Sequence, residues 1–365
     1  MAQARWYPTA LTLRDGRLLA ASGTGANEVE IYDPAADTWT TVAGATRTPQ
    51  ELYPSLHLLP SGQIFYSRAG WAQASTVDTT TKYLTLSGPA TGAWTDLGQQ
   101  QFYDRQEGVT VLQIDTTVSP PKTTITIVGG GVSGVPTSRN AQSAEAIELT
   151  AVGPGAAWTR LPDMGFPRTN VNVVLLPDGT LLVIGGQRNG QWNSDPGAVL
   201  EAEIYDPRAG TWTPAAPMAF PRQYHSVAVL LPDGRVLSAG GVDPSPGAPN
   251  RDQRALELFS PPYLSMGARP TITAAPPTAA YGAAFAVNTP DAARIDSVSL
   301  LRPASQTHHT DADRRYIKIP IQSGTATRLN VGAPANGNIA PPGYYMLFIV
   351  DSDGIPSVGR FVRIG

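Results

Sequence analysis

Short runs that alternate apolar and polar residues recur along the chain, and a two-residue turn signal follows each run. The clearest copies are "ARWYPTALTLRDGRLLAASG" (4–23), "PRTNVNVVLLPDGTLLVIGG" (167–186) and "PRQYHSVAVLLPDGRVLSAGG" (221–241), with a weaker copy at 51–67. Period-2 alternation is typical of strands, and Asp-Gly or Ser-Gly between two such runs is typical of tight hairpins. Each copy therefore predicts a strand, a turn and a second strand.

A second hairpin follows in two of these repeats. The segments "EIYDPAADTWT" (30–40) and "EIYDPRAGTWT" (203–213) are nearly identical. We expect the Tyr32–Trp39 and Tyr205–Trp212 pairs to pack between neighbouring sheets, because such large rings bury much apolar surface.

The diglycines give the repeat length, since Gly130-Gly131, Gly185-Gly186 and Gly240-Gly241 recur every 55 residues. This spacing exceeds the roughly 40–50 residues of a typical four-stranded β-propeller unit, so a propeller with long connecting loops is predicted. Five units are predicted, the third of them degenerate, at about 4–43, 51–97, 105–163, 167–216 and 221–262.

The pattern changes after a linker at 260–270. Diglycines and Trp hairpins stop, and alternating stretches such as "DSVSLLR", "RRYIKIPI" and "GYYMLFIVDSDG" appear. These short strands predict a small antiparallel sandwich. The chain is therefore expected to be all-β, with a propeller at 1–262, a sandwich at 263–365 and no helix of any length.

Composition narrows the function classes. The net charge is −3 with no basic block, so the sequence does not favour binding to nucleic acid or to an anionic membrane surface. The chain contains no cysteine, which excludes disulfides, thiolate metal ligands and cysteine nucleophiles. No apolar run is long enough for a membrane span, and the first residues lack the apolar core of a secretory signal.

Only four histidines are present, and one of them follows a tyrosine just before a strand, as Tyr224-His225. Adjacent side chains on a regular strand point to opposite faces, so both could reach one metal only from an irregular segment. Tyr7, Asn170 and Tyr224 each stand two residues after an arginine, and equivalent positions of a propeller converge on its axis. His57 lies within an apolar strand pattern, where we expect a structural role.

The remaining histidines, His308 and His309, stand in the polar stretch "QTHHTDADRR" (306–315). Two phenols and two imidazoles form a nitrogen and oxygen ligand set that suits Cu(II). The residue pattern leaves two interpretations open, a metal site or ordinary structural and surface residues.

Several of these stretches together resemble the copper radical oxidases, the galactose oxidase and glyoxal oxidase family. They are "ARWYPTALTLRDGR", "PRQYHSVAVLLPDGR", "QTHHTDADRR" and "PPGYYMLFIVDSDGIPSVGRFVRI", in the family's order. The resemblance implies a kelch-type propeller, with about five blades here of an expected seven, followed by an immunoglobulin-like domain that sends a ligand-bearing loop up the propeller axis.

The resemblance also implies an activity. Family members hold one Cu(II) per chain and oxidise a primary alcohol, an aldehyde or a carbohydrate with O2, giving H2O2. It further implies a secreted, extracellular protein that acts as a monomer on small molecules. By motif, Tyr7 is similar to the radical-bearing ligand, Tyr224 to the axial tyrosine that takes the substrate proton, and His225 and His308 to the imidazole ligands. His309 is the alternative to His308.

The chain departs from the family pattern in two respects. The family's radical tyrosine is cross-linked to a cysteine, which this chain lacks. We also expect the upstream blade that carries the cysteine to be absent. We expect a truncated oxidase or a short natural relative. Gly25 stands where the galactose-oxidase type has a tryptophan, which favours the glyoxal oxidase branch. The alternatives are a non-catalytic kelch-type module that binds carbohydrate or protein, and a structural fragment with an open sheet edge.

Overall fold

The structure is a computed structural model, and it describes residues 1–46, 51–68, 71–72, 80–100, 105–131, 142–150, 156–188, 197–243 and 251–365. Strands dominate these residues, and the helical elements among them are two short 3-10 turns, η2 (Pro262–Leu264) and η3 (Ala292–Arg294). None of the helices in the described ranges is long and apolar enough to span a bilayer. The predicted all-β fold class is confirmed.

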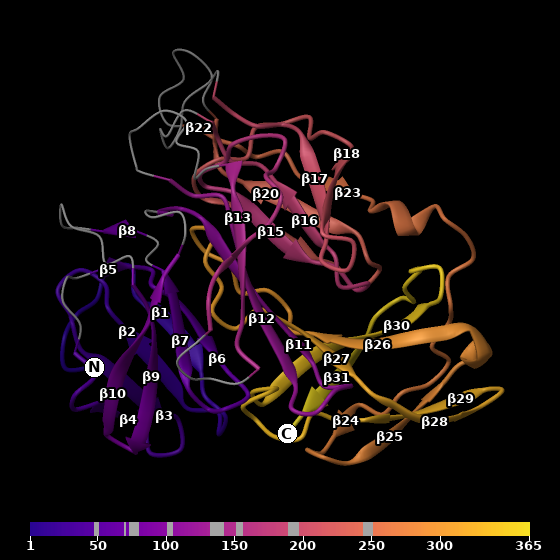
Figure 1. Cartoon of the computed structure of the whole chain (residues 1–365), viewed down its shortest axis with the longest axis horizontal. Helices are drawn as coiled ribbons and strands as arrows, with labels where there is room; N and C mark the ends of the chain where they lie inside the picture. The colour runs from indigo at the N-terminus through magenta and orange to yellow at the C-terminus, as the bar shows by residue number, and fades with distance from the viewer. Residues whose placement is uncertain are drawn as a thin grey trace.

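The five predicted repeats form five successive sheets that we call blades 1 to 5 (Figure 1). Blades 1 and 2 contain β1 (Thr9–Thr12), β2 (Leu18–Ala21), β3 (Val29–Asp33), β4 (Thr38–Thr41), β6 (Ser55–Leu58), β7 (Ile64–Arg68), β9 (Thr80–Gly88) and β10 (Thr91–Gln99). Blades 3 and 4 contain β11 (Val109–Asp115), β12 (Lys122–Val128), β13 (Ala144–Glu148), β14 (Thr159–Arg160), β15 (Asn172–Leu175), β16 (Leu181–Ile184), β17 (Ala202–Asp206) and β18 (Thr211–Ala215). Blade 5 has three described strands, β19 (Ser226–Leu230), β20 (Val236–Gly240) and β23 (Glu257–Phe259).

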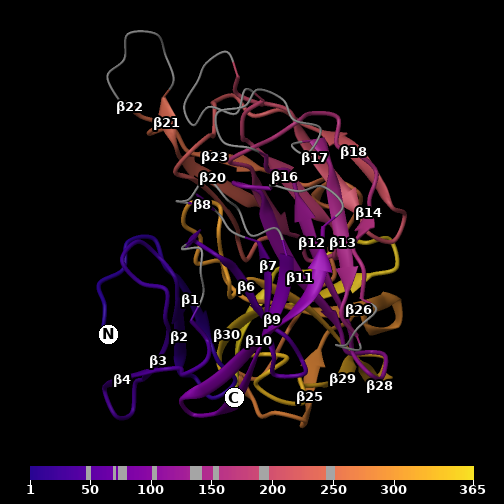
Figure 2. The same ribbon diagram turned by 60° about the vertical axis from the view of Figure 1, so that its left-hand side comes forward.

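Two small ribbons lie outside the blades. They pair β5 (Glu51–Leu52) with β8 (Trp71–Ala72), and β21 (Val242–Asp243) with β22 (Arg251–Asp252). Figure 2 shows the β21–β22 ribbon projecting away from the rest of the chain.

We call the first strand of each blade its inner strand. A buried ion pair fixes the segment before the inner strand in four of the five blades. The pairs are Arg5–Glu30, Arg105–Glu145, Arg168–Glu203 and Arg222–Glu257, with N···O distances of 2.6 to 3.3 Å. Each guanidinium also donates to backbone carbonyls, as Arg105 does to Gly129 and Ser143. This satisfies most of its N–H groups, which a buried charge requires.

The diglycines join one blade to the next. The N–H of Gly186 donates to the carbonyl of Arg222 at 2.7 Å, and the N–H of Gly130 donates to the carbonyl of Arg168 at 2.9 Å. A Cβ on Gly185 would lie 2.5 Å from the Arg222 carbonyl oxygen, and the φ of Gly185 is 68°. A side chain there would clash with the neighbouring blade, so the position requires glycine.

The predicted second hairpin forms in both blades, as β3–β4 and β17–β18, and its expected packing between sheets is confirmed for blade 4 and wrong for blade 1. The rings of Tyr205 and Trp212 lie 4.9 Å apart in a tilted arrangement, and Tyr205 is buried. The indole N–H of Trp212 donates to the Pro162 carbonyl of blade 3. Tyr32 and Trp39 make the same pair at 5.1 Å, but Trp39 is 36% exposed. Trp39 is more exposed because no described blade covers that face of blade 1.

The C-terminal part contains β24 (Thr278–Ala279), β25 (Ala284–Asn288), β26 (Ile295–Leu301), β27 (Arg315–Ile319), β28 (Ile321–Thr325), β29 (Arg328–Gly332), β30 (Gly343–Asp351) and β31 (Arg360–Ile364). Strands β25, β29 and β28 form one sheet, and the others join the sheet of blade 3. The junction is a parallel pairing of β11 with β27, in which Leu112 lies opposite Arg315. The division at residue 262 stays a prediction.

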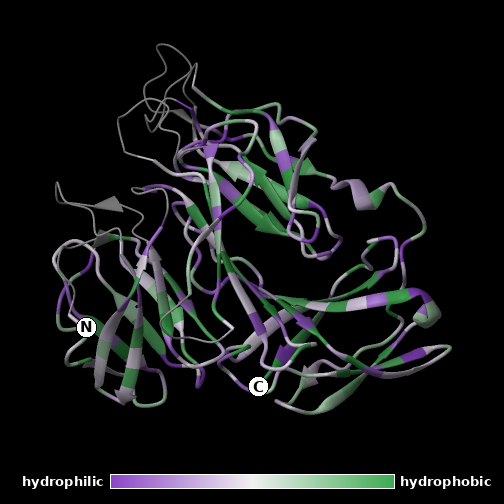
Figure 3. Cartoon of the chain, viewed as in Figure 1, coloured by the Kyte–Doolittle hydropathy of each residue, from purple (hydrophilic) through white to green (hydrophobic). Residues whose placement is uncertain are grey.

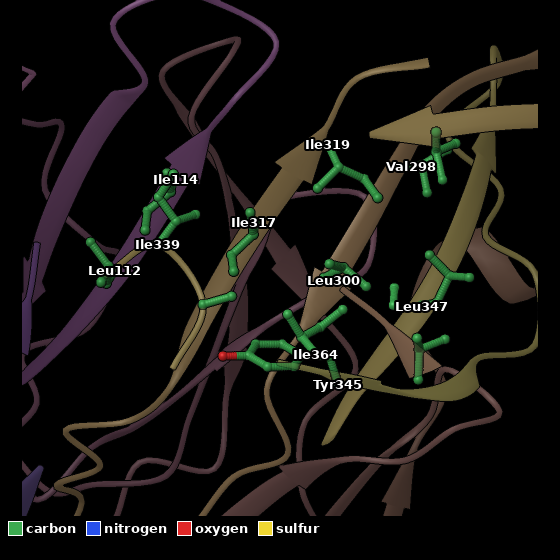
Figure 4. Packing of buried hydrophobic residues seen from close by; sticks show 14 of the residues in the cluster. Leu112, Ile114, Val298, Leu300, Ile317, Ile319, Ile339, Tyr345, Leu347 and Ile364 are labelled. Atoms are coloured by element: carbon green, nitrogen blue, oxygen red, sulfur yellow. The ribbon is translucent and has the colours of Figure 1, made fainter. Parts of the chain in front are cut away.

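The largest apolar core lies where these sheets meet. Leu112 and Ile114 of β11 pack with Leu300, Ile317 and Leu347 of the C-terminal sheet, all fully buried (Figure 4). Figure 3 shows hydrophobic segments alternating with polar ones along the strands. This core anchors both ends of the segment between β26 and β27, which carries His308.

Candidate metal centre

The same backbone position precedes the inner strand of every blade. It is the eighth residue before the turn residue of the hairpin, and its φ is positive in all five blades. The residues and their φ angles are Tyr7 (61°), Tyr53 (48°), Glu107 (60°), Asn170 (53°) and His225 (66°). A positive φ is uncommon for residues other than glycine and turns each side chain away from the regular strand direction.

This register corrects one prediction. Counting forward from the arginine placed Tyr224 with Tyr7 and Asn170, but counting back from the turn shows that His225 is their equivalent. Blade 5 has one extra residue between Arg222 and β19, and Tyr224 occupies it. The segment is therefore irregular, as expected, and the rings of Tyr224 and His225 stack on one side with centroids 3.8 Å apart.

The segment between β26 and β27 brings His308 to this ring of positions. Thr307 and Thr310 close a tight turn through two backbone hydrogen bonds, and His308 and His309 inside the turn have φ angles of 48° and 67°. The two imidazoles consequently point in different directions. His308 is half-buried against blades 1, 2 and 5, whereas His309 is only 2% exposed.

Polar contacts with three blades hold this segment in place. Gln306 donates from its amide nitrogen to Asn172 of blade 4 at 2.8 Å and accepts from the N–H of Ala228 of blade 5 at 3.0 Å. Asp313 accepts from the N–H and the hydroxyl of Thr12 of blade 1.

All four predicted ligand residues lie together. The Nε2 atoms of His225 and His308 are 2.9 Å apart, and the phenol oxygens of Tyr7 and Tyr224 are 3.3 Å apart. The ring of His308 lies 4.6 Å from that of Tyr7 and 5.3 Å from that of Tyr224. The two tyrosines are separated by 217 residues in the sequence, so only the tertiary structure brings these side chains together.

The donor atoms fit a tetragonal copper ion. Two nitrogens bound at about 2.0 Å in neighbouring positions of such an ion are about 2.8 Å apart, close to the observed separation of the imidazoles. Within the described ranges no three His, Cys, Asp or Glu side chains come together as a metal site. A metal here must therefore accept phenol oxygens, as Cu(II) does.

The surroundings favour the neutral, metal-binding form of His308. Burial, helped by the neighbouring His225, lowers the pKa of His308 to about 4. The Nδ1 atom of His308 lies 2.8 Å from the Thr307 hydroxyl, so a proton on Nδ1 leaves the Nε2 lone pair directed at His225.

Burial and the hydrogen bond with Tyr7 raise the pKa of the Tyr224 phenol. The phenol is therefore protonated at neutral pH unless a metal replaces its proton.

Two neighbours of the cluster were not identified from the sequence. Tyr53 stacks on Tyr7 at 4.7 Å and on His308 at 4.6 Å, and burial raises its pKa to about 12. Glu107 is 6% exposed, and one of its carboxylate oxygens accepts from the Asn170 amide at 2.7 Å. The sequence signal that could have identified Tyr53 and Glu107 is their position, eight residues before the turn of each hairpin.

Comparisons with known proteins identify the family of the chain. A family model described as "Glyoxal oxidase N-terminus" matches residues 1–263, and one described as "Galactose oxidase-like, Early set domain" matches residues 269–364. The chain therefore belongs to the galactose oxidase and glyoxal oxidase family, the copper radical oxidases.

Three relatives show how far the likeness extends. The chain is 28% identical to a galactose oxidase of Gibberella zeae, over 100% of the chain and 55% of that protein. It is 30% identical to the aldehyde oxidase GLOX of Vitis pseudoreticulata, over 99% of the chain and 72% of that protein. A WSC domain-containing protein of Arthroderma benhamiae is 32% identical, over 99% of the chain and 39% of its own length. The chain thus spans about half or less of the galactose oxidase and the WSC protein.

A solved structure of a fungal alcohol oxidase in complex with copper has a TM-score of 0.87 with this chain. The two are 27% identical, and the match covers 100% of this chain and 76% of that one.

Proposed function

We propose that this protein is a copper-dependent oxidase that converts primary alcohols or aldehydes with O2 and releases H2O2. The observation that carries the proposal is the convergence of two imidazoles and two phenols from blade 1, blade 5 and the β26–β27 segment. Family membership supports copper as the metal. His225, His308, Tyr7 and Tyr224 would hold one copper ion per chain.

The chain's own groups divide the remaining work. Copper, when bound, supplies a one-electron acceptor and lowers the pKa of a hydroxyl bound to it. Alcohol oxidation releases two electrons and two protons. Because copper accepts only one electron, Tyr7, as a phenoxyl radical, would accept the other. Tyr224 would accept the proton of the substrate hydroxyl. Reduction of O2 to H2O2 consumes the two electrons and two protons.

We further propose that turnover is slower than in a family member with a cross-linked tyrosine. The sequence contains no cysteine, so Tyr7 cannot form a thioether within this chain. Its ring instead stacks between Trp6 at 5.1 Å and Tyr53 at 4.7 Å. Stacked rings supply some stabilisation of an electron-poor ring, without the covalent link.

An EPR spectrum of the copper-loaded protein, taken after removal of excess metal, tests the proposal. We expect one tetragonal Cu(II) per chain, lost in His308→Ala and retained in the control His57→Gln, which changes a histidine outside the cluster. Loss of copper in His309→Ala but not in His308→Ala would reassign the ligand.

Absence of stoichiometric copper in the unchanged protein would reject the oxidase. It would favour the alternative, a non-catalytic kelch-type module that binds carbohydrate or protein, an interpretation that the missing cysteine supports.

A further inference from the structure

A second polar cluster lies between blades 4 and 5 and the C-terminal sheet, in a cavity that none of the four metal-ligand candidates lines. Three arginines line a cavity of about 20 Å3: Arg302 and Arg314 of the β26–β27 segment, and Arg315 at the start of β27. The rest of its wall is apolar and comes from blades 4 and 5, β26, the segment after it and β30: Val174, Leu175, Ala228, Leu230, Leu301, Ala304 and Met346. Among the residues that the structure describes, no carboxylate lines this cavity. Its size is enough for one water or one small ion.

Two of the arginines have buried N–H groups that find no acceptor in the part of the chain that the structure describes. These groups are Nε of Arg314, a residue that is 4% exposed, and Nη2 of Arg315, which is 0% exposed. Other nitrogens of the same groups are bonded, Arg314 to the carbonyls of Val173 and His309, and Arg315 to those of Asp313, Asn338 and Ile339. Buried N–H groups are rarely left unpaired, because each costs about 1–3 kcal/mol.

The local charges do not balance either. Asp313 forms an ion pair with Arg302 at 3.4 Å, and Asp311 lies 4.0 Å from Arg314. The carboxylate of Asp311 also accepts hydrogen bonds from the backbone N–H groups of Ser305, Asp313 and Arg314. Three guanidiniums thus face two carboxylates, which leaves one buried positive charge.

A nearby imidazole reports the same excess of positive charge. Burial, together with the charges of Arg315 and Arg314, lowers the pKa of His57 to about 3.

We propose that the cavity binds one small inorganic anion, chloride in ordinary buffers, held by Nε of Arg314 and Nη2 of Arg315. A monovalent anion supplies the missing negative charge and accepts hydrogen bonds from both unpaired N–H groups. A water molecule can accept these hydrogen bonds but supplies no charge. Because Arg314 also binds Val173 of β15 and the His309 carbonyl, the anion stabilises the turn that carries His308. The site does not depend on copper or on turnover.

Crystals of the unchanged protein grown in about 0.5 M bromide provide the direct test. We expect one anomalous peak in the cavity, within hydrogen-bonding distance of Arg314 and Arg315. Electron density for a water without an anomalous peak would overturn the proposal.

Thermal unfolding of metal-free protein gives an independent test in solution. Replacing gluconate by chloride at equal ionic strength should raise Tm by roughly 2–4 °C, because gluconate is too large for the cavity. Arg314→Met should lose this rise, and Arg254→Met, at an exposed arginine, should keep it. An equal Tm in chloride and gluconate would also overturn the proposal.

Discussion

The Nε2 atoms of His225 and His308 lie 2.9 Å apart, although 83 residues separate them in the chain. Without a metal this contact requires a proton on one of the two nitrogens, because two lone pairs at that distance repel. Thr307 lies beside the far nitrogen of His308 and holds the imidazole in the orientation that exposes Nε2. The pair is therefore arranged to exchange a proton for a metal ion.

Thr307→Val tests this arrangement, since valine keeps the shape and removes the hydroxyl. We expect the Kd for Cu(II) to rise by about 10- to 100-fold, the usual effect of losing an outer-shell partner. Competitive titration against a chelator measures it. Thr327→Val, at an exposed threonine of the β28–β29 turn, is the control. Unchanged affinity in Thr307→Val would show that the hydroxyl does not orient His308.

Tyr224→Phe separates metal binding from catalysis. The variant keeps the aromatic ring that stacks on His225 but loses the phenol oxygen 3.3 Å from Tyr7. We expect copper to remain bound and peroxide formation to fall by about 10²- to 10⁴-fold, the range for loss of a general base. Tyr344→Phe, at a 61% exposed tyrosine, should retain full activity. Full activity of Tyr224→Phe would remove Tyr224 from the proton transfer.

Arg105→Met tests the ion pairs that fix the blades. Arg105 and Glu145 are both fully buried, so removing the guanidinium leaves a buried carboxylate without its partner. We expect a loss of about 3–5 kcal/mol in the free energy of unfolding, measured by urea denaturation. Arg160→Met breaks an exposed pair with Asp163 and should cost less than about 1 kcal/mol. Similar costs for the two variants would contradict a structural role for the buried pair.

The repeats could be predicted because hairpin chemistry is local. An Asp-Gly turn and period-2 alternation act over a few residues, so blades 1, 4 and 5 were visible in the sequence. Blade 3 was expected to be degenerate, yet β11 and β12 are seven-residue strands, and β11 pairs with β27. That parallel pairing joins segments about 200 residues apart and has no local signal.

The site could be predicted only in part for the same reason. Tyr224 and His225 are adjacent, and their irregular segment follows from the need to reach one metal. The position of His308 depends on tertiary contacts such as Gln306 with Asn172, 134 residues away, and Asp313 with Thr12, 301 residues away. Its role therefore rested on family resemblance, and Tyr53 escaped notice because no such motif marks it.

The buried imidazole of His57 should make the metal-free protein sensitive to acid. Its Nε2 atom bonds the Thr110 hydroxyl at 2.8 Å, and burial together with Arg315 and Arg314 lowers its pKa to about 3. The unfolded chain has an ordinary histidine with a pKa of about 6.5. Between these values the unfolded chain binds a proton that the folded chain does not, so stability is full above pH 6.5 and declines as the pH falls toward 3.

His57→Gln removes this proton linkage. From pH 7 to pH 5 the free energy of unfolding should fall by about 2 kcal/mol less in the variant than in the unchanged protein, because the unfolded state gains no proton at this position. Urea denaturation of both metal-free proteins at the two pH values measures the difference. The other histidines are common to both proteins and cancel in the comparison. Equal declines would mean that His57 is protonated in the folded protein, and that Arg314 and Arg315 do not hold it neutral.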